Sequence, residues 1–495
     1  MKNNCQNCKN VVQFNVTQQI CVNTYNFLTS KGVIMEIKTI VDTQRELFLT
    51  GKTLSYKFRM HQLELLELSI KKHQQELLKA FKIDLNKCEF DAVTTEISLA
   101  MQEIKYFKKH LKSLMKKHNV HTTLLNFPSK GQIIHEPYGQ VLIMSPWNYP
   151  FQLTIAPLVA SIAGGNTSVV KPSAYTPNVA ETIKNILDIF DPAYISTVMG
   201  GREQNQALLD QKFDLIFFTG SKEVGKVVQE KASANLCPVV LELGGKSPCI
   251  VDETADLKRA VRRIVWGKYL NAGQTCIAPD YIFVHQSIYE KFLEMAVEQI
   301  KQYYYPNGKL NPDFMYIVNE KHTTRLKGLI DPKRVICGGK AKGRQLEPTI
   351  MRDVTFDDAI MKEEIFGPIM PVLPYTDIKD VISYINKNDK PLALYYFSRN
   401  KKSINNIVSL TSSGGVCINE VIMHFTEHNL PFGGVGASGM GNYHGKNSFL
   451  TFTHAKCILK KNPKIELMVK YPPYTDKKSK FVYFYLGYDS KKSQK

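Results

Sequence analysis

The chain has 495 residues, too many for one simple domain, so two or three lobes around a large core are expected. A hydrophobic content of 43% with 22% charged residues is ordinary for a soluble globular protein. Ten cysteines are too sparse over this length for a disulfide scaffold, which indicates a reducing, cytoplasmic compartment.

The net charge of +19 raises the question of a nucleic-acid partner. Residues 456–495 alone carry eleven lysines against three acidic residues, so much of the excess lies in a basic C-terminal tail. No cluster of arginines and aromatics stands out elsewhere. We therefore expect a mildly basic surface and no nucleic acid.

Residues 1–34 are rich in Asn and Gln and show neither a helical period nor an apolar signal core. Cys5 and Cys8 form a lone CxxC with Cys21 nearby, but a fourth ligand at a sensible spacing is missing, so we predict a disordered leader and no metal. The composition changes at Met35, where a helical pattern begins, and our hypothesis is that translation of the functional protein starts at this residue. N-terminal sequencing of natively expressed protein would test it.

The body then changes from helices to alternating elements. Residues 44–81 and 93–117 repeat apolar residues at spacings of three and four, with Gly51 as a break. From residue 131 short apolar runs between turn residues predict strands, and strand-like segments alternate with helix-like ones. This pattern favours α/β lobes with largely parallel sheets.

A glycine-framed turn lies in FFTGSKEVG, which runs from an apolar strand into a helix with Gly220 and Gly225. Such a turn offers backbone N–H groups and a helix N-terminus to a phosphate. It is not a full GxGxxG, and an ordinary helix-capping turn explains it at least as well.

A carboxylate ends the strand in VVLELGGKSP, where Glu242 precedes two glycines. Burial there would raise its pKa, which suits a general base. A structural pair with Lys246 is an equally good interpretation.

An amide lies between stiffening prolines in IMSPWNYPFQ. The Asn148 side chain is a candidate oxyanion donor, and one such donor can be worth ~10²–10³ in rate. A buried turn amide is the plainer alternative.

A cysteine stands among small and polar residues in LNAGQTCIAPD. Packing would suit an apolar strand or helix face better, so Cys276 is a candidate nucleophile, unshielded because reactants must reach it. A free thiol titrates near ~8.5, so Glu242 and backbone N–H groups would have to help it ionise at neutral pH.

These stretches belong to a series of motifs along the chain: SPWNYP, VVKPSAYTP, FFTGSKEVG, LELGGKSP, NAGQTC, EEIFGP and LPFGGVGASGMGNYHGKNSFLTFTH. In this order they resemble the NAD(P)-dependent aldehyde dehydrogenases, from about residue 36 to Tyr474. SSGGVCIN, KPLALYYFS and the late KYPPY look most like the class-three branch. Its members are typically dimers that favour medium- or long-chain aliphatic and aromatic aldehydes.

The resemblance implies catalytic roles. Cys276 matches the nucleophile that forms a thiohemiacetal and then a thioester. The Asn148 amide and the Cys276 backbone N–H match the oxyanion donors. Glu242 matches the carboxylate that activates the hydrolytic water.

The resemblance also implies a nicotinamide cofactor and its contacts. Glu364 matches the residue that holds the nicotinamide ribose, with Phe366 beside the ring. Lys171 matches the contact to the adenosine ribose, and the residues placed near pyrophosphate and adenine are Gly220, Ser221 and Gly225.

One departure concerns the cofactor. Many NAD-preferring relatives carry a glutamate after Lys-Pro-Ser, but this chain has Ala174. Without that carboxylate a 2′-phosphate is not repelled, and Lys171 and Ser173 could hold it. We therefore predict that NADP is accepted as well as NAD.

The implied fold is a Rossmann-like cofactor domain, an α/β catalytic domain and a small β element for bridging and oligomerisation. We place the cofactor domain at 35–119 and 140–243, the catalytic domain at 244–431, and the bridging element at 120–139 and 432–455. The tail follows at 456–495.

Two alternatives stay open. A CoA-acylating dehydrogenase would pass the acyl group to CoA, although such relatives generally lack the base at Glu242. A non-catalytic binding protein could keep the fold, although every matched catalytic position holds the expected residue.

The apolar run FVYFYLGY at 481–488 is far short of the ~20 residues of a spanning helix. Its flanking lysines could favour weak contact with an anionic membrane surface. A surface strand or a tail packed on the body is the alternative.

Overall fold

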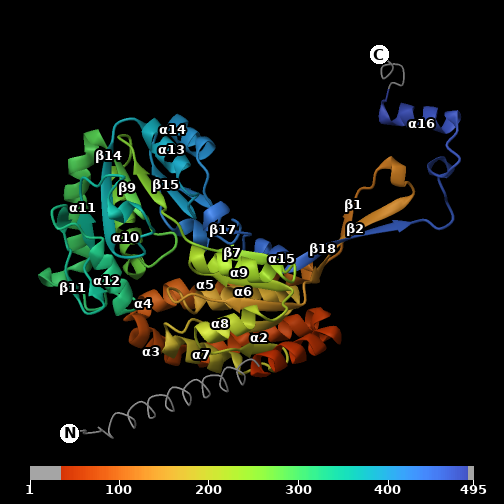
Figure 1. Cartoon of the computed structure of the whole chain (residues 1–495), viewed down its shortest axis with the longest axis horizontal. Coiled ribbons are helices and arrows are strands. Elements are labelled where there is room, and N and C mark those ends of the chain that lie inside the picture. The colour runs from red at the N-terminus through yellow and green to blue at the C-terminus, as the bar shows by residue number, and fades with distance from the viewer. Residues whose placement is uncertain (1–34, 489–495) are drawn as a thin grey trace, which may run out of the picture. The chain divides into compact units, whose positions relative to one another are not determined.

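The computed structural model describes residues 35–488, and the predicted leader with Cys5, Cys8 and Cys21 lies outside these residues. The described chain forms two compact units. The larger comprises residues 35–115 and 136–454, and the smaller comprises residues 116–135 and 455–488. Figure 1 shows the parallel-sheet architecture of the larger unit, which confirms the predicted α/β class.

A six-stranded sheet forms one lobe of the larger unit, in the order β17-β7-β6-β3-β4-β5. Its inner strands are parallel and only β17 runs antiparallel. The chain winds from β3 to one side and then, from β6, to the other, so β3 and β6 flank the switch point where α/β sheets bind ligands. The strands are β3 (Gln140–Met144), β4 (Thr167–Lys171), β5 (Ile195–Thr197), β6 (Leu215–Thr219), β7 (Val239–Glu242) and β17 (Gly439–Met440).

Helices cover this sheet, beginning with one over residues 35–49. The break predicted at Gly51 is confirmed, since its φ of 73° is left-handed. α6 (Gln152–Gly164) is largely apolar and entirely buried. The other helices of this lobe are α2 (Tyr56–Lys72), α3 (Gln74–Leu85), α4 (Glu89–Ala92), α5 (Ser98–Leu114), α7 (Pro177–Leu187), α8 (Arg202–Leu209), α9 (Lys222–Ser233) and α15 (Lys446–Thr451).

A seven-stranded sheet forms the second lobe, in the order β10-β13-β14-β9-β8-β15-β16, parallel except for the edge strand β10. Its strands are β8 (Pro248–Val251), β9 (Tyr281–His285), β10 (Val335–Cys337), β13 (Thr349–Met351), β14 (Ile369–Tyr375), β15 (Ala393–Phe397) and β16 (Gly415–Ile418). A short hairpin pairs β11 (Ala341–Lys342) with β12 (Gln345–Leu346). The helices are α10 (Leu257–Tyr269), α11 (Tyr289–Tyr304), α12 (Glu320–Gly328), α13 (Ile378–Lys387) and α14 (Lys401–Leu410).

The smaller unit holds a three-stranded sheet of β1 (His118–Val120), β2 (Ser129–Pro137) and β18 (Thr453–Lys461). Most of the segment 432–455, which we expected to join residues 120–139, falls instead in the larger unit. The rings of Tyr443 and Phe452 pack on Phe217 of β6, which explains the difference.

The apolar run near the C-terminus forms a helix, α16 (Asp476–Leu486), so the alternative of a surface strand is wrong. Thr475 caps its first turn and Gly487 ends it in the left-handed conformation. Among the described residues, no helix combines the length and apolarity required to traverse a bilayer.

Candidate active site

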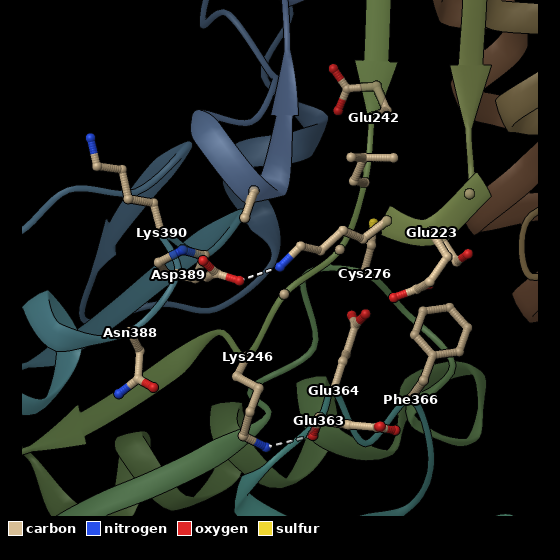
Figure 2. A pocket seen from close by; sticks show the side chains of 18 of the residues that line it. Glu223, Glu242, Lys246, Cys276, Glu363, Glu364, Phe366, Asn388, Asp389 and Lys390 are labelled. Atoms are coloured by element: carbon tan, nitrogen blue, oxygen red, sulfur yellow. Dashed lines mark hydrogen bonds and ion pairs between the residues drawn. The ribbon is translucent and has the colours of Figure 1, made fainter. Parts of the chain in front are cut away.

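A pocket of about 860 Å³ lies between the two lobes of the larger unit (Figure 2). On one side are the segments that follow β3, β6 and β7, at the carboxyl ends of the six-stranded sheet. On the other are the segments that precede β8, β9, β14 and β15 in the second sheet. The predicted site residues that line it are Asn148, Gly220, Ser221, Glu242, Cys276, Glu364 and Phe366.

The turn before Cys276 is sharply bent. Asn271 and Ala272 have φ of 57° and 52°, and Gly273 follows with φ of 72°. A Cβ on Gly273 would meet the Gly367 carbonyl oxygen at 2.2 Å, so only glycine fits there. Left-handed backbone at two non-glycine residues costs free energy, and such strain is concentrated at functional sites.

Cys276 is partly exposed, whereas residues 271–275 and 277–284 are buried, and it faces the pocket, where a reactant can reach its thiol. Burial raises the pKa of its thiol, and the nearby Glu364 and Glu242 raise it further. The backbone N–H groups of Cys276 and Ile277 oppose this shift. With its pKa raised in this way, the thiol needs a base to ionise at neutral pH.

Glu242 ends β7 and is 2% exposed. Neither carboxylate oxygen has a hydrogen-bond partner among the described residues. Lys246, the structural partner considered above, pairs instead with Asp280. Burial without a partner holds the pKa of Glu242 well above its ordinary value.

Asn148 follows β3 and is 4% exposed. Its side-chain Nδ2 donates to the backbone carbonyl of Gln274 at 3.0 Å, and the backbone carbonyl of Asn148 accepts from Asn271 Nδ2 at 2.9 Å. An amide has two N–H bonds, so one remains for a ligand. The plainer alternative of a turn amide and the oxyanion role are thus compatible.

Glu364 and Phe366 precede β14, and Figure 2 shows the Glu364 carboxylate pointing toward Cys276. Burial, together with the charge of Asp280, raises the pKa of Glu364 to about 8. Phe366 meets Trp147 edge to face with ring centroids 5.3 Å apart.

Gly220 and Ser221 follow β6 and begin the wall formed by α9. The Gly220 N–H donates to the Glu242 carbonyl at 3.0 Å. Ser221 Oγ accepts from the Val224 N–H, so this turn does cap a helix. The same turn lines the pocket wall, where its backbone N–H groups can face a phosphate.

Other predicted cofactor residues do not line this pocket. Lys171 is buried at the end of β4, where its Nζ donates to the carbonyls of Gly200 at 2.6 Å and Pro172 at 2.8 Å. Burial lowers the pKa of Lys171 to about 8. Ser173 Oγ accepts from the Tyr175 N–H.

Gly225 serves helix packing in this structure. It is buried in α9, and a Cβ there would approach Leu243 Cδ2 within 2.8 Å. Its absence of a side chain therefore brings α9 close to the segment after β7.

Two residues to which no sequence pattern assigned a role hold the segment bearing Glu364. Lys246 Nζ donates to the Ile360 and Glu363 carbonyls, each at 2.9 Å, and Arg325 donates to the Ile365 carbonyl at 2.5 Å. Lys246 stood in a quoted motif, whereas no pattern singled out Arg325.

The pocket fits a nicotinamide cofactor. A glycine turn and a helix start lie on one wall, which suits a pyrophosphate. A carboxylate of raised pKa and an aromatic ring lie on the other. Part of the wall is kept open by Gly244, where a Cβ would meet Glu364 Oε2 at 2.2 Å. No group of three metal-ligating side chains is found within residues 35–488.

Two largely parallel sheets flank a pocket that holds a cysteine and two carboxyl groups of raised pKa, an arrangement that suits an aldehyde-oxidising dehydrogenase. The aldehyde dehydrogenase family model matches residues 24–458, and the chain belongs to this family. It is an oxidoreductase that uses NAD or NADP.

Curated relatives agree with the class-three resemblance. The chain is 47% identical to 4,4'-diaponeurosporen-aldehyde dehydrogenase of Staphylococcus aureus, over 88% of this chain and 95% of that protein. It is 43% identical to aldehyde dehydrogenase family 3 member A2 of Mus musculus (89% and 92%). It is 42% identical to the dimeric NADP-preferring aldehyde dehydrogenase of Canis lupus familiaris (88% and 98%).

A solved structure, the substrate-bound state of Staphylococcus aureus AldH, superposes with a TM-score of 0.89 at 45% identity. The match covers 91% of this chain and 99% of that one.

Proposed function

We propose that Cys276 is the nucleophile of the aldehyde oxidation and that Glu242 is the base for hydrolysis. The observation that carries this assignment is the buried, unpartnered Glu242 carboxylate in the same pocket as the Cys276 thiol. A carboxyl group with a raised pKa can both accept and return a proton near neutral pH.

The reaction begins when the Cys276 thiol gives its proton to a base and its sulfur bonds to the aldehyde carbon. The carbonyl oxygen becomes an oxyanion, which accepts from the free Asn148 N–H and the Cys276 backbone N–H. When bound, the nicotinamide ring supplies the hydride acceptor, so loss of hydride leaves a thioester on Cys276. Glu242 then takes a proton from water, hydroxide adds to the thioester, and the acid leaves as the thiol is restored.

We assign the cofactor contacts as follows. Glu364 accepts from the nicotinamide ribose hydroxyls, Phe366 packs beside the ring, and Gly220 and Ser221 border the pyrophosphate. Lys171 and Ser173 hold the adenosine ribose. Ala174 leaves room and no repulsion for a 2′-phosphate, so NADP is accepted together with NAD.

Medium- or long-chain aliphatic and aromatic aldehydes are the proposed substrates. The relatives named above include one that is named for 4,4'-diaponeurosporen-aldehyde. Absorbance at 340 nm with a panel from acetaldehyde to hexadecanal, plus benzaldehyde, gives the chain-length preference.

The decisive test compares the wild-type protein with Cys276→Ala and Glu242→Gln. We expect reduction of NAD or NADP that Cys276→Ala abolishes, with a free carboxylic acid as product. Full activity of folded Cys276→Ala would refute the assignment of Cys276 as the nucleophile. Acyl-CoA formed only when CoA is added would instead favour the acylating alternative.

We also propose a cytoplasmic homodimer, since one relative is named as dimeric. The residues proposed for its contact are 120–139 and 432–455, the two segments that the sequence assigns to bridging and oligomerisation. A light-scattering mass of about 113 kDa, twice 56.3 kDa, is expected, and a monomer would refute it.

Peripheral membrane contact through α16 is a further part of the proposal. Its Phe484 is 88% exposed, and Lys477, Lys478 and Lys480 stand in the same helix. Such a helix suits an anionic interface. Co-sedimentation with phosphatidylserine vesicles, but not phosphatidylcholine vesicles, should be lost in Phe484→Ser.

A further inference from the structure

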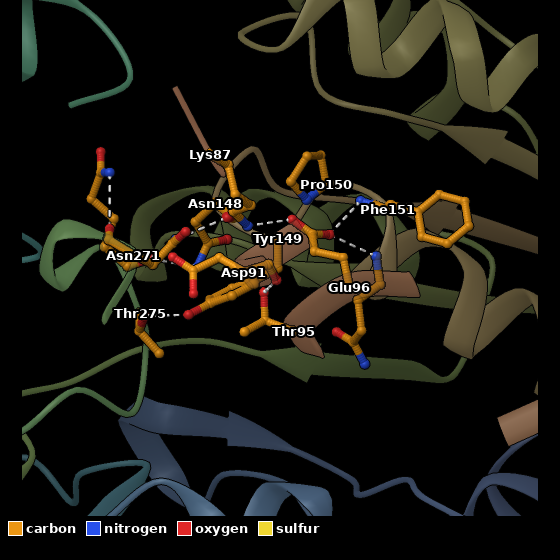
Figure 3. A network of polar contacts seen from close by, with 12 residues as sticks. Lys87, Asp91, Thr95, Glu96, Asn148, Tyr149, Pro150, Phe151, Asn271 and Thr275 are labelled. Atoms are coloured by element: carbon orange, nitrogen blue, oxygen red, sulfur yellow. Dashed lines mark hydrogen bonds and ion pairs between the residues drawn. The ribbon is translucent and has the colours of Figure 1, made fainter. Parts of the chain in front are cut away.

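Hydrogen bonds tie the segment bearing Asn148 to the turn bearing Cys276 (Figure 3). Besides the two Asn148 contacts described above, the Tyr149 hydroxyl shares a hydrogen bond of 2.7 Å with Thr275 Oγ1. Thr275 directly precedes the nucleophile. Tyr149 therefore links the residue after the oxyanion donor to the residue before the thiol.

A buried ion pair lies on the other side of Tyr149. Lys87 Nζ and Glu96 Oε1 are 2.6 Å apart, and their side chains are 1% and 0% exposed. The second Glu96 oxygen, Oε2, accepts from the backbone N–H groups of Phe151 and Gln152, both at 3.0 Å. The Lys87 ammonium lies 4.6 Å from the centroid of the Tyr149 ring.

Both ends of the segment are therefore fixed. Glu96 holds the backbone immediately after Pro150, where α6 begins, and Lys87 holds the aromatic face of Tyr149 by a cation–π contact. Buried polar groups that are hydrogen-bonded to one another favour one geometry. Burial also raises the pKa of Tyr149, so its phenol stays neutral and can share its hydrogen bond with Thr275 at any working pH.

We infer that Tyr149, fixed by the Lys87–Glu96 pair, is a positioning residue that sets the geometry between the Cys276 thiol and the Asn148 amide. The inference rests on the proposed roles of Cys276 and Asn148. Its physical reason is that both groups must act on one carbonyl, and a misplacement of about 1 Å can cost about 10² in rate.

The test removes one hydrogen bond from either side. Tyr149→Phe keeps the ring over Lys87, and Thr275→Val keeps the branched shape at 275. We expect each to lower kcat by about tenfold, well within the cost of a small misplacement, with KM for the cofactor unchanged. The double variant should lose no more than either single variant, because both remove the same bond.

A second readout does not depend on turnover. The rate of alkylation of Cys276 by iodoacetamide, followed by peptide mass spectrometry, should shift in the same direction and by the same factor in both single variants. Since this rate can be measured whether or not an aldehyde is oxidised, failure of the proposed function is seen separately from failure of this inference.

The matched control is Tyr289→Phe. Tyr289 is also a buried tyrosine, but its hydroxyl donates to Asp353 Oδ1 at 3.1 Å and to the Val372 carbonyl at 3.3 Å, away from the segments bearing Asn148 and Cys276. Its variant should keep kcat and the alkylation rate. Unchanged kcat and alkylation in Tyr149→Phe, or losses that multiply in the double variant, would overturn the inference.

The ion pair is tested by charge. Lys87→Arg keeps the cation and should retain most activity, whereas a folded Lys87→Met protein should lose kcat as Tyr149→Phe does. Equal activity of Lys87→Met and wild type would also overturn the inference.

Discussion

The α-carbon of Gly244 lies against the carboxylate of Glu364. A methyl group at 244 would be 2.2 Å from Oε2 and 2.6 Å from Oε1, well inside van der Waals contact. The backbone N–H of the next residue, Gly245, stabilises the ionised form of the same carboxylate. The two glycines after β7 thus form the surface against which the Glu364 side chain, from the other lobe, packs.

We predict that Gly244→Ala displaces Glu364 and raises KM for NAD by at least about tenfold, equivalent to ~1.4 kcal/mol of lost binding. Titration of NADH fluorescence measures the affinity directly. Gly328→Ala is the control, because a Cβ there meets no atom within 4 Å and should leave binding unchanged. Normal NADH affinity in Gly244→Ala would show that Gly244 does not position Glu364 for cofactor binding.

Cofactor binding should depend on pH through Glu364. Its pKa of about 8 means that the carboxyl group is largely protonated at pH 7 and ionised at pH 9. Since the carboxylate is the better acceptor for ribose hydroxyls, KM for the cofactor should fall as pH rises through 8. Glu364→Gln should flatten this profile, and a wild-type profile that is flat from pH 7 to 9 would count against the role.

Glu242→Gln should stop the reaction after the first half. The proposed base is removed while the shape is kept, so we expect one equivalent of NADH per active site in a rapid burst and very slow steady turnover. Mass spectrometry of the quenched protein should find the acyl group on Cys276. Normal turnover without a burst would refute the role of Glu242 as the base for hydrolysis.

The same variant should be more stable than wild type at alkaline pH. The folded pKa of Glu242 is raised, so its protonated form contributes stability below the unfolded pKa that is lost as pH rises. Glutamine does not titrate. The Tm difference between Glu242→Gln and wild type should therefore be larger at pH 8.5 than at pH 5.5. An equal difference at the two pH values would show that burial does not raise the pKa of Glu242.

Breaking the Lys87–Glu96 pair should cost much more than breaking an exposed one. Lys87→Met leaves a buried carboxylate without its cation, for which about 3–5 kcal/mol of unfolding free energy is typical. Lys184→Met removes an exposed partner of Asp188 and should cost less than about 1 kcal/mol. Urea unfolding of both variants measures the contrast.

The cofactor choice should follow residue 174. Ala174→Glu places a negative charge where a 2′-phosphate is proposed to lie, so kcat/KM for NADP should fall by about tenfold or more while that for NAD holds or rises. Kinetics with both cofactors at one ionic strength decide this. A wild-type preference for NAD of a hundredfold would reject the premise.

Much of the site could be predicted because the motifs occur in the order of a known family and lie near predicted strands. Asn148, Glu242, Cys276 and Glu364 line one pocket although they lie far apart in the chain. Asn148 and Glu242 follow or end strands of one parallel sheet, and Cys276 and Glu364 precede strands of the other, so the facing ends of the two sheets bring them together. The alternation of apolar strands and amphipathic helices likewise predicted the two sheets.

Pairings between side chains could not be predicted in the same way. Lys246 has Glu242 nearby in sequence but pairs with Asp280, because the fold brings that carboxylate to it. The contact of Glu96 with residues 151 and 152 joins segments with no shared motif. The aromatic run at 481–488 has strand propensity, yet the caps at Thr475 and Gly487 make it helical.

The raised pKa values of Cys276, Glu242 and Glu364 have a joint consequence. At neutral pH these three groups hold protons and contribute little negative charge to the pocket. A ligand that brings positive charge into it must expel protons into the buffer. Occupancy can therefore be counted with a pH-indicator dye, or by calorimetry in buffers of different ionisation enthalpy, without any chromophore on the ligand.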